Sequence, residues 1–145
     1  DNMEKTARGI LIVEKEKGKY LVSIKRTKYR KDGEYVYYTF PGGHVEEGET
    51  YEETLIREIE EELGINVKIK SIFEEFYNED LKRNEKFFIC EYVSGTFGTG
   101  TGPEFTNIDL TRYGKYEIEY LSIDKIEDYN LLPKEISRKI AETIK

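Results

Sequence analysis

The sequence predicts an α/β fold in which a central mixed β-sheet is covered by helices on both faces. Strand-like segments occur both before and after one strongly helical segment at residues 50–63. A second amphipathic segment at 133–145 carries Ile136, Ile140 and Ile144 at helical spacing. Strands combined with packing helices in this order are typical of a layered α/β domain. At 145 residues, the chain is predicted to form a single domain over residues 1–145.

The strand predictions rest on runs of β-branched and aromatic residues that are bounded by turn residues. The predicted strands are 8–13, 20–25, 35–40, 67–77, 86–93 and 116–122. Lys17-Gly18 and residues 78–85 supply turns, and 123–128 is predicted as a short turn or helix. Residues 94–103 hold four Gly and one Pro, which indicates a mobile hairpin loop inside the domain and not a domain boundary.

The helix at 50–63 has a predicted start and a predicted end. Thr50 is a typical N-cap, and Glu53 three residues later completes a capping box. Gly64 is a typical C-terminal stop. The apolar face is predicted to consist of Leu55, Ile56, Ile59 and Leu63.

Composition places the chain among soluble proteins. It is 37% hydrophobic and 37% charged, no apolar run approaches the roughly 20 residues of a membrane span, and the start has no signal-peptide pattern. The single cysteine, Cys90, lies in the apolar run FFIC and predicts a buried, inert thiol. One cysteine cannot form an internal disulfide, so we expect a reducing, cytoplasmic setting.

The net charge of −7 is concentrated in one segment. Residues 46–62 contain nine Glu and one Arg, and the remainder of the chain is nearly neutral. Glu58, Glu61 and Glu62 share one helix face because they are spaced i, i+3 and i+4. Clustered carboxylates beside the Gly42-Gly43 turn predict a site for hard divalent cations. A basic cluster at 25–31 either meets a phosphate-rich ligand or is simply solvated.

The segment from Gly43 to Ile65 resembles the signature of a known family. Gly43, five residues, Glu49, seven residues and then Arg57-Glu58-Ile59-Glu60-Glu61-Glu62-Leu63-Gly64-Ile65 match the Nudix box at every defined position. The resemblance implies a Nudix-type α/β/α sandwich in which the box forms a strand, a loop and a helix. The short length looks most like the MutT-type group of this family.

The resemblance also implies roles for residues of the box. Glu58, Glu61 and Glu62 are expected to bind Mg²⁺, with Mn²⁺ as a substitute, together with the main-chain carbonyl of Gly42. These three Glu form the expected catalytic set, with Glu61 named as the base that helps to deprotonate water. Arg57 and Glu49 are expected to form an ion pair that orients the loop against the helix; together with Gly43 they support the site, and Glu53 can share Arg57. The remaining glutamates of this segment are expected to be solvated: Glu46, Glu47, Glu52 and Glu60.

Residues outside the box are weaker candidates. A further carboxylate for the metal is expected at Glu104, with Glu117 as second choice; a plain surface carboxylate is the alternative for both. Arg26 is expected near substrate phosphates and Tyr38 as a base-stacking residue, although packing within the sheet is the alternative for the tyrosine. His44, the only histidine, is expected to be a loop residue and not a catalytic group.

The resulting hypothesis is a metal-dependent hydrolase that cleaves a pyrophosphate bond in a nucleoside diphosphate linked to another group. A nucleoside triphosphate or a related small nucleotide is the expected partner. The acidic charge and the absence of a basic-aromatic module predict no nucleic acid, and no membrane is expected; a homodimer is allowed. Members of the family that act on ADP-ribose often carry a proline shortly after the box. This chain has no proline between Pro41 and Pro103, which argues against ADP-ribose as the substrate.

Two alternatives remain open. One is a non-catalytic nucleotide sensor on the same fold, although such proteins usually lose box carboxylates and this chain retains all of them. The other is a pyrophosphohydrolase acting on a dinucleotide, an isoprenoid diphosphate or a capped RNA.

Overall fold

A computed structural model describes residues 3–102 and 110–144 of the chain. The chain forms two compact units from interleaved stretches. The first unit consists of residues 1–11 and 41–100, and the second of residues 12–40 and 101–145. Strand β1 (Glu4–Lys15) contributes its first part to the first unit and its end to the second.

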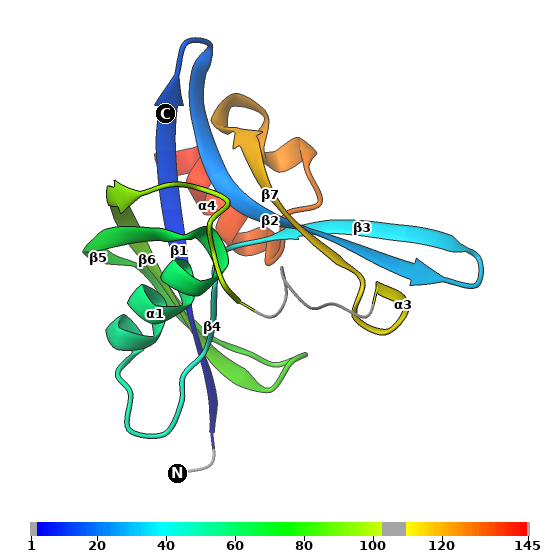
Figure 1. Cartoon of the computed structure of the whole chain (residues 1–145), viewed down its shortest axis with the longest axis horizontal. Helices are drawn as coiled ribbons and strands as arrows, with labels where there is room; N and C mark the ends of the chain where they lie inside the picture. Colours follow the sequence, from blue (N-terminus) through cyan, green and yellow to red (C-terminus); the bar gives the residue numbers. More distant parts are fainter. Residues whose placement is uncertain (1–2, 103–109, 145) are drawn as a thin grey trace. The chain divides into compact units, whose positions relative to one another are not determined.

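The first unit is built on a mixed sheet (Figure 1). The start of β1 pairs antiparallel with β4 (Gly42–His44) and parallel with β6 (Arg83–Gly95). Strand β5 (Ile65–Asn78) pairs antiparallel with β6. The coexistence of parallel and antiparallel pairs confirms the predicted mixed sheet.

Helix α1 (Tyr51–Leu63) packs against β4 and β5. Leu55, Ile59 and Leu63 are fully buried, as their spacing predicts. The helix lies so close to β1 that a Cβ on Gly9 would be 3.0 Å from Cδ1 of Ile59. The inclusion of Ile56 in the apolar face was wrong, because it is 36% exposed. Its position, about 100° around the helix from Leu55, places it at the margin of the buried stripe.

The second unit is centred on β2 (Gly18–Arg30). This strand pairs antiparallel with the end of β1, with β3 (Gly33–Thr39) and with β7 (Lys115–Ser122). The 3₁₀ segment η1 (Ile123–Asp128) contacts β2 and β7, and α4 (Lys134–Thr143) packs on η1.

Most predicted elements are present, but the structure corrects several. The short strand β4 and the short helix α3 (Leu110–Tyr113) were not predicted. The predicted hairpin around residues 94–103 is wrong, because β6 pairs with β1 and β5 whereas β7 pairs with β2. Along α4, Ile136 and Ile140 are fully buried, as predicted. Cys90 is also buried, as its apolar surroundings in the sequence predict.

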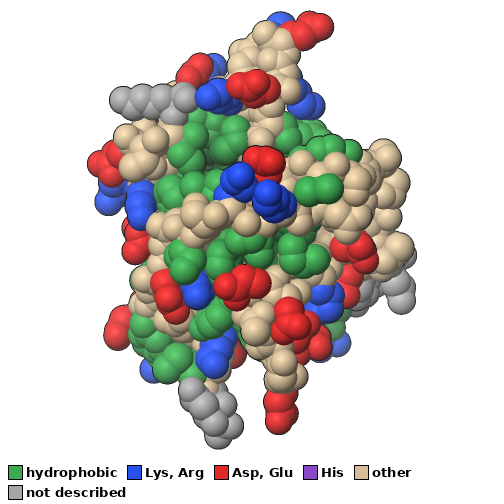
Figure 2. Space-filling view, turned by 90° about the vertical axis from the view of Figure 1, so that its left-hand side faces the viewer, with side chains coloured by type: hydrophobic (Ala, Val, Ile, Leu, Met, Phe, Trp, Pro, Cys, Tyr) green, Lys and Arg blue, Asp and Glu red, His purple; other side chains and the backbone are tan. Residues whose placement is uncertain are grey.

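The surface carries charges of both signs. On the face drawn in Figure 2, acidic and basic side chains are interspersed among hydrophobic ones. Large apolar side chains are exposed on β5 and β6, among them Ile72, Tyr92 and Val93. Within residues 3–102 and 110–144, none of the helices has the length and apolar character that a membrane span needs.

Candidate active site

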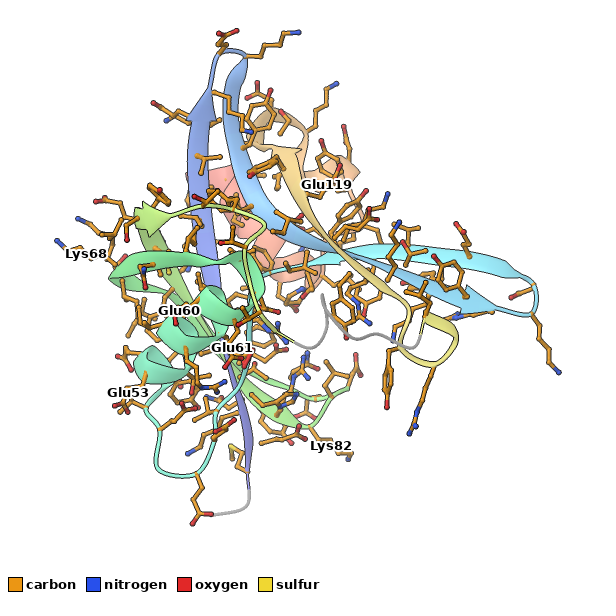
Figure 3. All side chains as sticks on the ribbon, viewed as in Figure 1. Glu53, Glu60, Glu61, Lys68, Lys82 and Glu119 are labelled. Carbon is orange, nitrogen blue, oxygen red and sulfur yellow. The ribbon has the colours of Figure 1, made fainter. Side chains whose placement is uncertain are left out.

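The helix that carries the acidic cluster has defined ends, which fixes the direction in which its side chains project. The Thr50 hydroxyl accepts a hydrogen bond from the Glu53 amide at 3.0 Å, and Oε1 of Glu53 accepts from the Thr50 amide at 2.9 Å. Gly64 ends the helix in the left-handed conformation, with φ of 77°. The predicted capping box and glycine stop are therefore confirmed. Figure 3 marks Glu53 at the start of α1 and Glu60 and Glu61 towards its end.

Two glycines of β4 let the sheet approach this helix closely. Gly42 has a φ of 144°, and a Cβ there would collide with the main-chain oxygen of Ala7. A Cβ on Gly43 would lie 2.6 Å from the carboxyl carbon of Glu58. The main chain of β1 therefore excludes a side chain at Gly42, whereas a side chain at Gly43 would displace the carboxylate end of Glu58.

Two of the three glutamates expected to bind the metal meet β4 directly. Glu62 is only 7% exposed, and its Oε1 accepts a hydrogen bond from the Gly42 amide at 2.8 Å. That bond offsets part of the cost of burying a carboxylate. Glu58 lies against Gly43, and its Oε2 accepts from Nη1 of Arg57 at 2.8 Å. Glu61 lies on the same helix face with a more exposed side chain, 3.5 Å from the same Nη1.

Arg57 links the loop before the helix to these carboxylates. Its Nε donates to Oε2 of Glu49 at 2.8 Å and its Nη2 donates to Oε1 at 3.0 Å. Oε1 of Glu49 also accepts from the Thr54 hydroxyl at 2.7 Å. These hydrogen bonds, that from Arg57 first, lower the pKa of Glu49 to about 2. The hydrogen bonds to Glu49 and, after them, the one to Glu58 raise the pKa of Arg57 above its usual value. The predicted Arg57–Glu49 pair is therefore present in the structure.

One prediction about the neighbouring glutamates is wrong. Glu53 does not share Arg57; its carboxylate is used by the capping box. Glu46 is exposed, as predicted, and its Oε1 also lies 3.6 Å from Nη2 of Arg57. The loop reverses between β4 and α1, and this brings Glu46 nearer to the guanidinium than Glu53, one turn away along the helix.

Family comparisons agree with this arrangement. The family model described as the NUDIX domain matches residues 3–135, which is most of the chain. The chain belongs to the Nudix family. An ADP-ribose pyrophosphatase from Methanocaldococcus jannaschii is 33% identical to this Nudix chain over 97 residues, which cover 63% of the chain and 56% of that protein. An 8-oxo-dGTP diphosphatase from Haemophilus influenzae is 40% identical over 62 residues, which cover 41% of the chain and 46% of that protein.

These matched stretches span about half the length of the two curated relatives. Among solved structures, a mutT/nudix family protein from Listeria innocua superposes on this Nudix chain with a TM-score of 0.66. The superposition covers 97% of this chain and 92% of that one at 20% identity. At that level of identity the similarity supports the Nudix fold.

The donor set on α1 suits the hard divalent cation that Nudix chemistry implies, because carboxylate and main-chain carbonyl oxygens are the ligands that such ions prefer. Among the residues that the structure describes, no three acidic, histidine or cysteine side chains form a group that could hold a metal ion. Glu58 is turned to Arg57 and Glu62 to the Gly42 amide. The metal-ligand assignments of Glu58, Glu61, Glu62 and Gly42 therefore stay predictions.

Arg8 is a neighbour of the Nudix box that the sequence did not single out. It lies in β1 directly opposite Gly42. Burial lowers its pKa, while the nearby charges of Glu62, Glu85 and Glu58 act in the opposite direction. Its relation to the box depends on the unpredicted strand β4, so no local sequence signal could have revealed it.

His44 is placed differently from the expectation. It lies on β4 and not in a loop, and its Nδ1 is 3.1 Å from Oε1 of Glu4. Burial and the charge of Arg83 lower the pKa of His44, whereas Glu4 opposes that shift.

The expected substrate residues of this Nudix chain lie in the second unit. Arg26 is 9% exposed; its Nη2 donates to the Tyr113 carbonyl at 2.8 Å and its guanidinium lies 3.6 Å from the ring centre of Tyr116. Tyr38 packs edge-on against Tyr129, with ring centres 5.7 Å apart. Both residues thus have structural contacts within their unit, and their substrate roles stay predictions.

The metal roles expected of two carboxylates outside the Nudix box stay predictions. Glu104 lies outside the described residues. Glu117 is on β7, opposite Lys25 of β2, and its Oε2 lies 3.5 Å from Nζ of Lys115.

Proposed function

We propose that this chain is a metal-dependent pyrophosphohydrolase. It cleaves a pyrophosphate bond in a nucleoside diphosphate linked to another group, by attack of water on phosphorus. The observation that carries the proposal is the packing of α1 against β4. It places Glu58 against Gly43 and Glu62 on the Gly42 amide, with Arg57 held at two points by Glu49.

Each group of this site has a proposed role. Glu58, Glu61, Glu62 and the main-chain carbonyl of Gly42 hold Mg²⁺, for which Mn²⁺ can substitute. Bound there, the ion neutralises phosphate charge and makes a coordinated water more acidic. Glu61 accepts the proton of the attacking water, which suits its position as the most exposed of the three carboxylates. The ion pair between Arg57 and Glu49 holds the loop after β4 in a fixed position against helix α1.

At phosphorus, the reaction makes one bond and breaks one bond. The water oxygen bonds to phosphorus, its proton passes to the Glu61 carboxylate, and the bridging P–O bond breaks. The displaced phosphate group keeps the electron pair of that bond, so no redox partner is needed.

The substrate class is a small nucleotide. The names of the two curated relatives, an ADP-ribose pyrophosphatase and an 8-oxo-dGTP diphosphatase, both describe cleavage next to a nucleoside phosphate. We propose a nucleoside triphosphate or a related nucleotide, which fits the MutT-type resemblance. The cytoplasmic setting and a homodimer stay predictions.

The decisive experiment compares Glu61→Gln and Glu62→Gln with the wild-type chain in Mg²⁺. ADP-ribose, normal and oxidised nucleoside triphosphates, nucleotide sugars and dinucleotides are screened with phosphate or nucleotide release as the readout. Both variants are expected to lose about 100-fold or more in rate. Glu60→Gln is the matched control, because it removes an exposed carboxylate from the same helix turn.

Full activity in both variants would contradict the proposal, provided that their melting temperatures match that of the wild type. Nucleotide binding without turnover in either Mg²⁺ or Mn²⁺ would instead indicate a sensor.

A further inference from the structure

The loop after β6 packs on the C-terminal end of the acidic helix. We call residues 95–100 of this loop the glycine clasp. The Gly98 amide donates to the Leu63 carbonyl at 3.1 Å. The Thr99 hydroxyl donates to the Thr96 carbonyl at 2.6 Å and lies 3.4 Å from the Gly64 carbonyl. The clasp therefore satisfies helix-end carbonyls that would otherwise need water or a basic side chain.

Gly100 makes the closest approach of the clasp to the proposed metal ligands. A Cβ on Gly100 would collide with the main-chain oxygen of Glu61 and lie 2.7 Å from both the carbonyl carbon and oxygen of Glu62. These are main-chain atoms, so rotating a side chain cannot make room. Gly100 does not adopt the left-handed backbone conformation, so the contact alone excludes a larger residue.

Gly18 has the opposite properties and serves as a comparison outside the clasp. Its φ is 138°, which an L-residue adopts only with strain, but a Cβ there would meet nothing within 4 Å. A side chain at Gly18 strains its own turn, whereas a side chain at Gly100 must displace either the loop or the helix end.

We infer that the glycine clasp is a positioning element that sets the places of Glu61 and Glu62 relative to β4, and thereby the affinity for the divalent cation. Two observations support this. The last turn of α1 contains no basic residue, so its carbonyl end depends on other partners. In addition, Glu62 is tied to the Gly42 amide at 2.8 Å, so a shift of the helix backbone at Glu62 must lengthen that bond or rotate the carboxylate.

This inference rests on the proposed function, because it concerns the carboxylates proposed to bind the metal. An ordinary helix cap would contribute only to stability. A positioning element must also change cation binding when its contact with Glu61 and Glu62 is altered. Supporting contacts around metal ligands are typically worth 10- to 100-fold in affinity.

The test compares Gly100→Ala with Gly18→Ala in three measurements. These are Mn²⁺ binding by electron paramagnetic resonance of the free ion, the melting temperature, and amide hydrogen exchange at residues 60–64. We expect Gly100→Ala to weaken Mn²⁺ binding about 10-fold or more and to speed exchange at the helix end. We expect Gly18→Ala to lower the melting temperature while keeping the wild-type Mn²⁺ affinity.

Each contrary result has a defined meaning. Unchanged Mn²⁺ affinity in Gly100→Ala would show that the loop moves and the helix does not, which overturns the inference alone. Equal weakening of Mn²⁺ binding in both variants would trace the loss to lower stability and not to the clasp, which overturns the inference. If the wild-type chain does not bind Mn²⁺, the proposed function fails as well.

If Gly100→Ala does not fold, Thr99→Ala decides the question, because it removes the clasp hydroxyl without a collision. It should weaken Mn²⁺ binding in the same direction by a smaller factor. Wild-type affinity in that variant would overturn the inference.

Discussion

Arg57 and Glu49 form a two-point ion pair, with Nε to Oε2 at 2.8 Å and Nη2 to Oε1 at 3.0 Å. The pair joins the loop after β4 to the middle of α1. Paired donors matched to a planar carboxylate fix direction as well as distance. Because Nη1 of Arg57 also reaches Glu58, the guanidinium connects the loop to one of the proposed metal ligands.

The first prediction concerns acid stability. The pKa of Glu49 falls from 4.5 to about 2 in the folded chain, chiefly through the hydrogen bonds from Arg57. A carboxylate whose pKa is lower in the folded state stabilises the fold above its unfolded pKa. The contribution should therefore be complete above about pH 4.5 and disappear as the pH falls towards 2.

Urea unfolding of Glu49→Gln between pH 2 and pH 7 tests this. The stability deficit relative to wild type should be largest near neutral pH and should shrink on acidification. Glu47→Gln, an exposed neighbour in the same loop, is the control. A deficit that stays constant with pH would exclude the ionised pair as its source.

The second prediction concerns the shape of the Arg57 donor set. Arg57→Lys keeps the positive charge but cannot donate two parallel hydrogen bonds to Glu49. The free energy of unfolding should fall, because the lysine loses one of the two matched hydrogen bonds to Glu49. Arg138→Lys changes an exposed arginine, 4.0 Å from Glu127, and should have almost no effect. Equal stability of Arg57→Lys and wild type would mean that charge alone is sufficient.

The third prediction separates site geometry from stability at Gly43. In Gly43→Ala, the new Cβ meets the end of the flexible Glu58 side chain, which can move aside at low cost to the fold. We expect a small change in melting temperature but a drop of about 10-fold or more in Mn²⁺ affinity. Gly48→Ala should do the reverse, because Gly48 has a φ of 84° and open space around it. Calorimetric titration with Mn²⁺ measures the affinity, and thermal melts measure the stability. Wild-type Mn²⁺ affinity in Gly43→Ala would contradict the prediction.

The fourth prediction concerns the thiol. Burial raises the pKa of Cys90 to about 12. The thiolate is the reactive form, so the native chain should resist iodoacetamide at pH 8 and become labelled once unfolded in urea. Intact-mass spectrometry measures the labelling. Rapid labelling of the native chain would show that the first unit opens around Cys90 under native conditions.

The sequence by itself determined the helix and its two ends. The Thr50–Glu53 capping box and the Gly64 stop join residues close together along the chain, whereas the Arg57–Glu49 pair was implied by the Nudix resemblance. Helical periodicity and cap chemistry act over such short separations, so they can be read from residue order alone. The same reasoning predicted the buried stripe and misplaced only Ile56, at its margin.

Only the tertiary structure decided what surrounds that helix. Strand β4 is three residues long and exists because it pairs with Thr6–Arg8 of β1, far away in sequence. The same pairing places Arg8 opposite Gly42, beside the carboxylates. Likewise, Gly100 is required by the helix main chain at Glu61 and Glu62, whereas its own neighbours indicated only a loop. Such contacts form only when segments that are distant in sequence pack together. The residue pattern of one segment does not indicate which distant segment will pack on it.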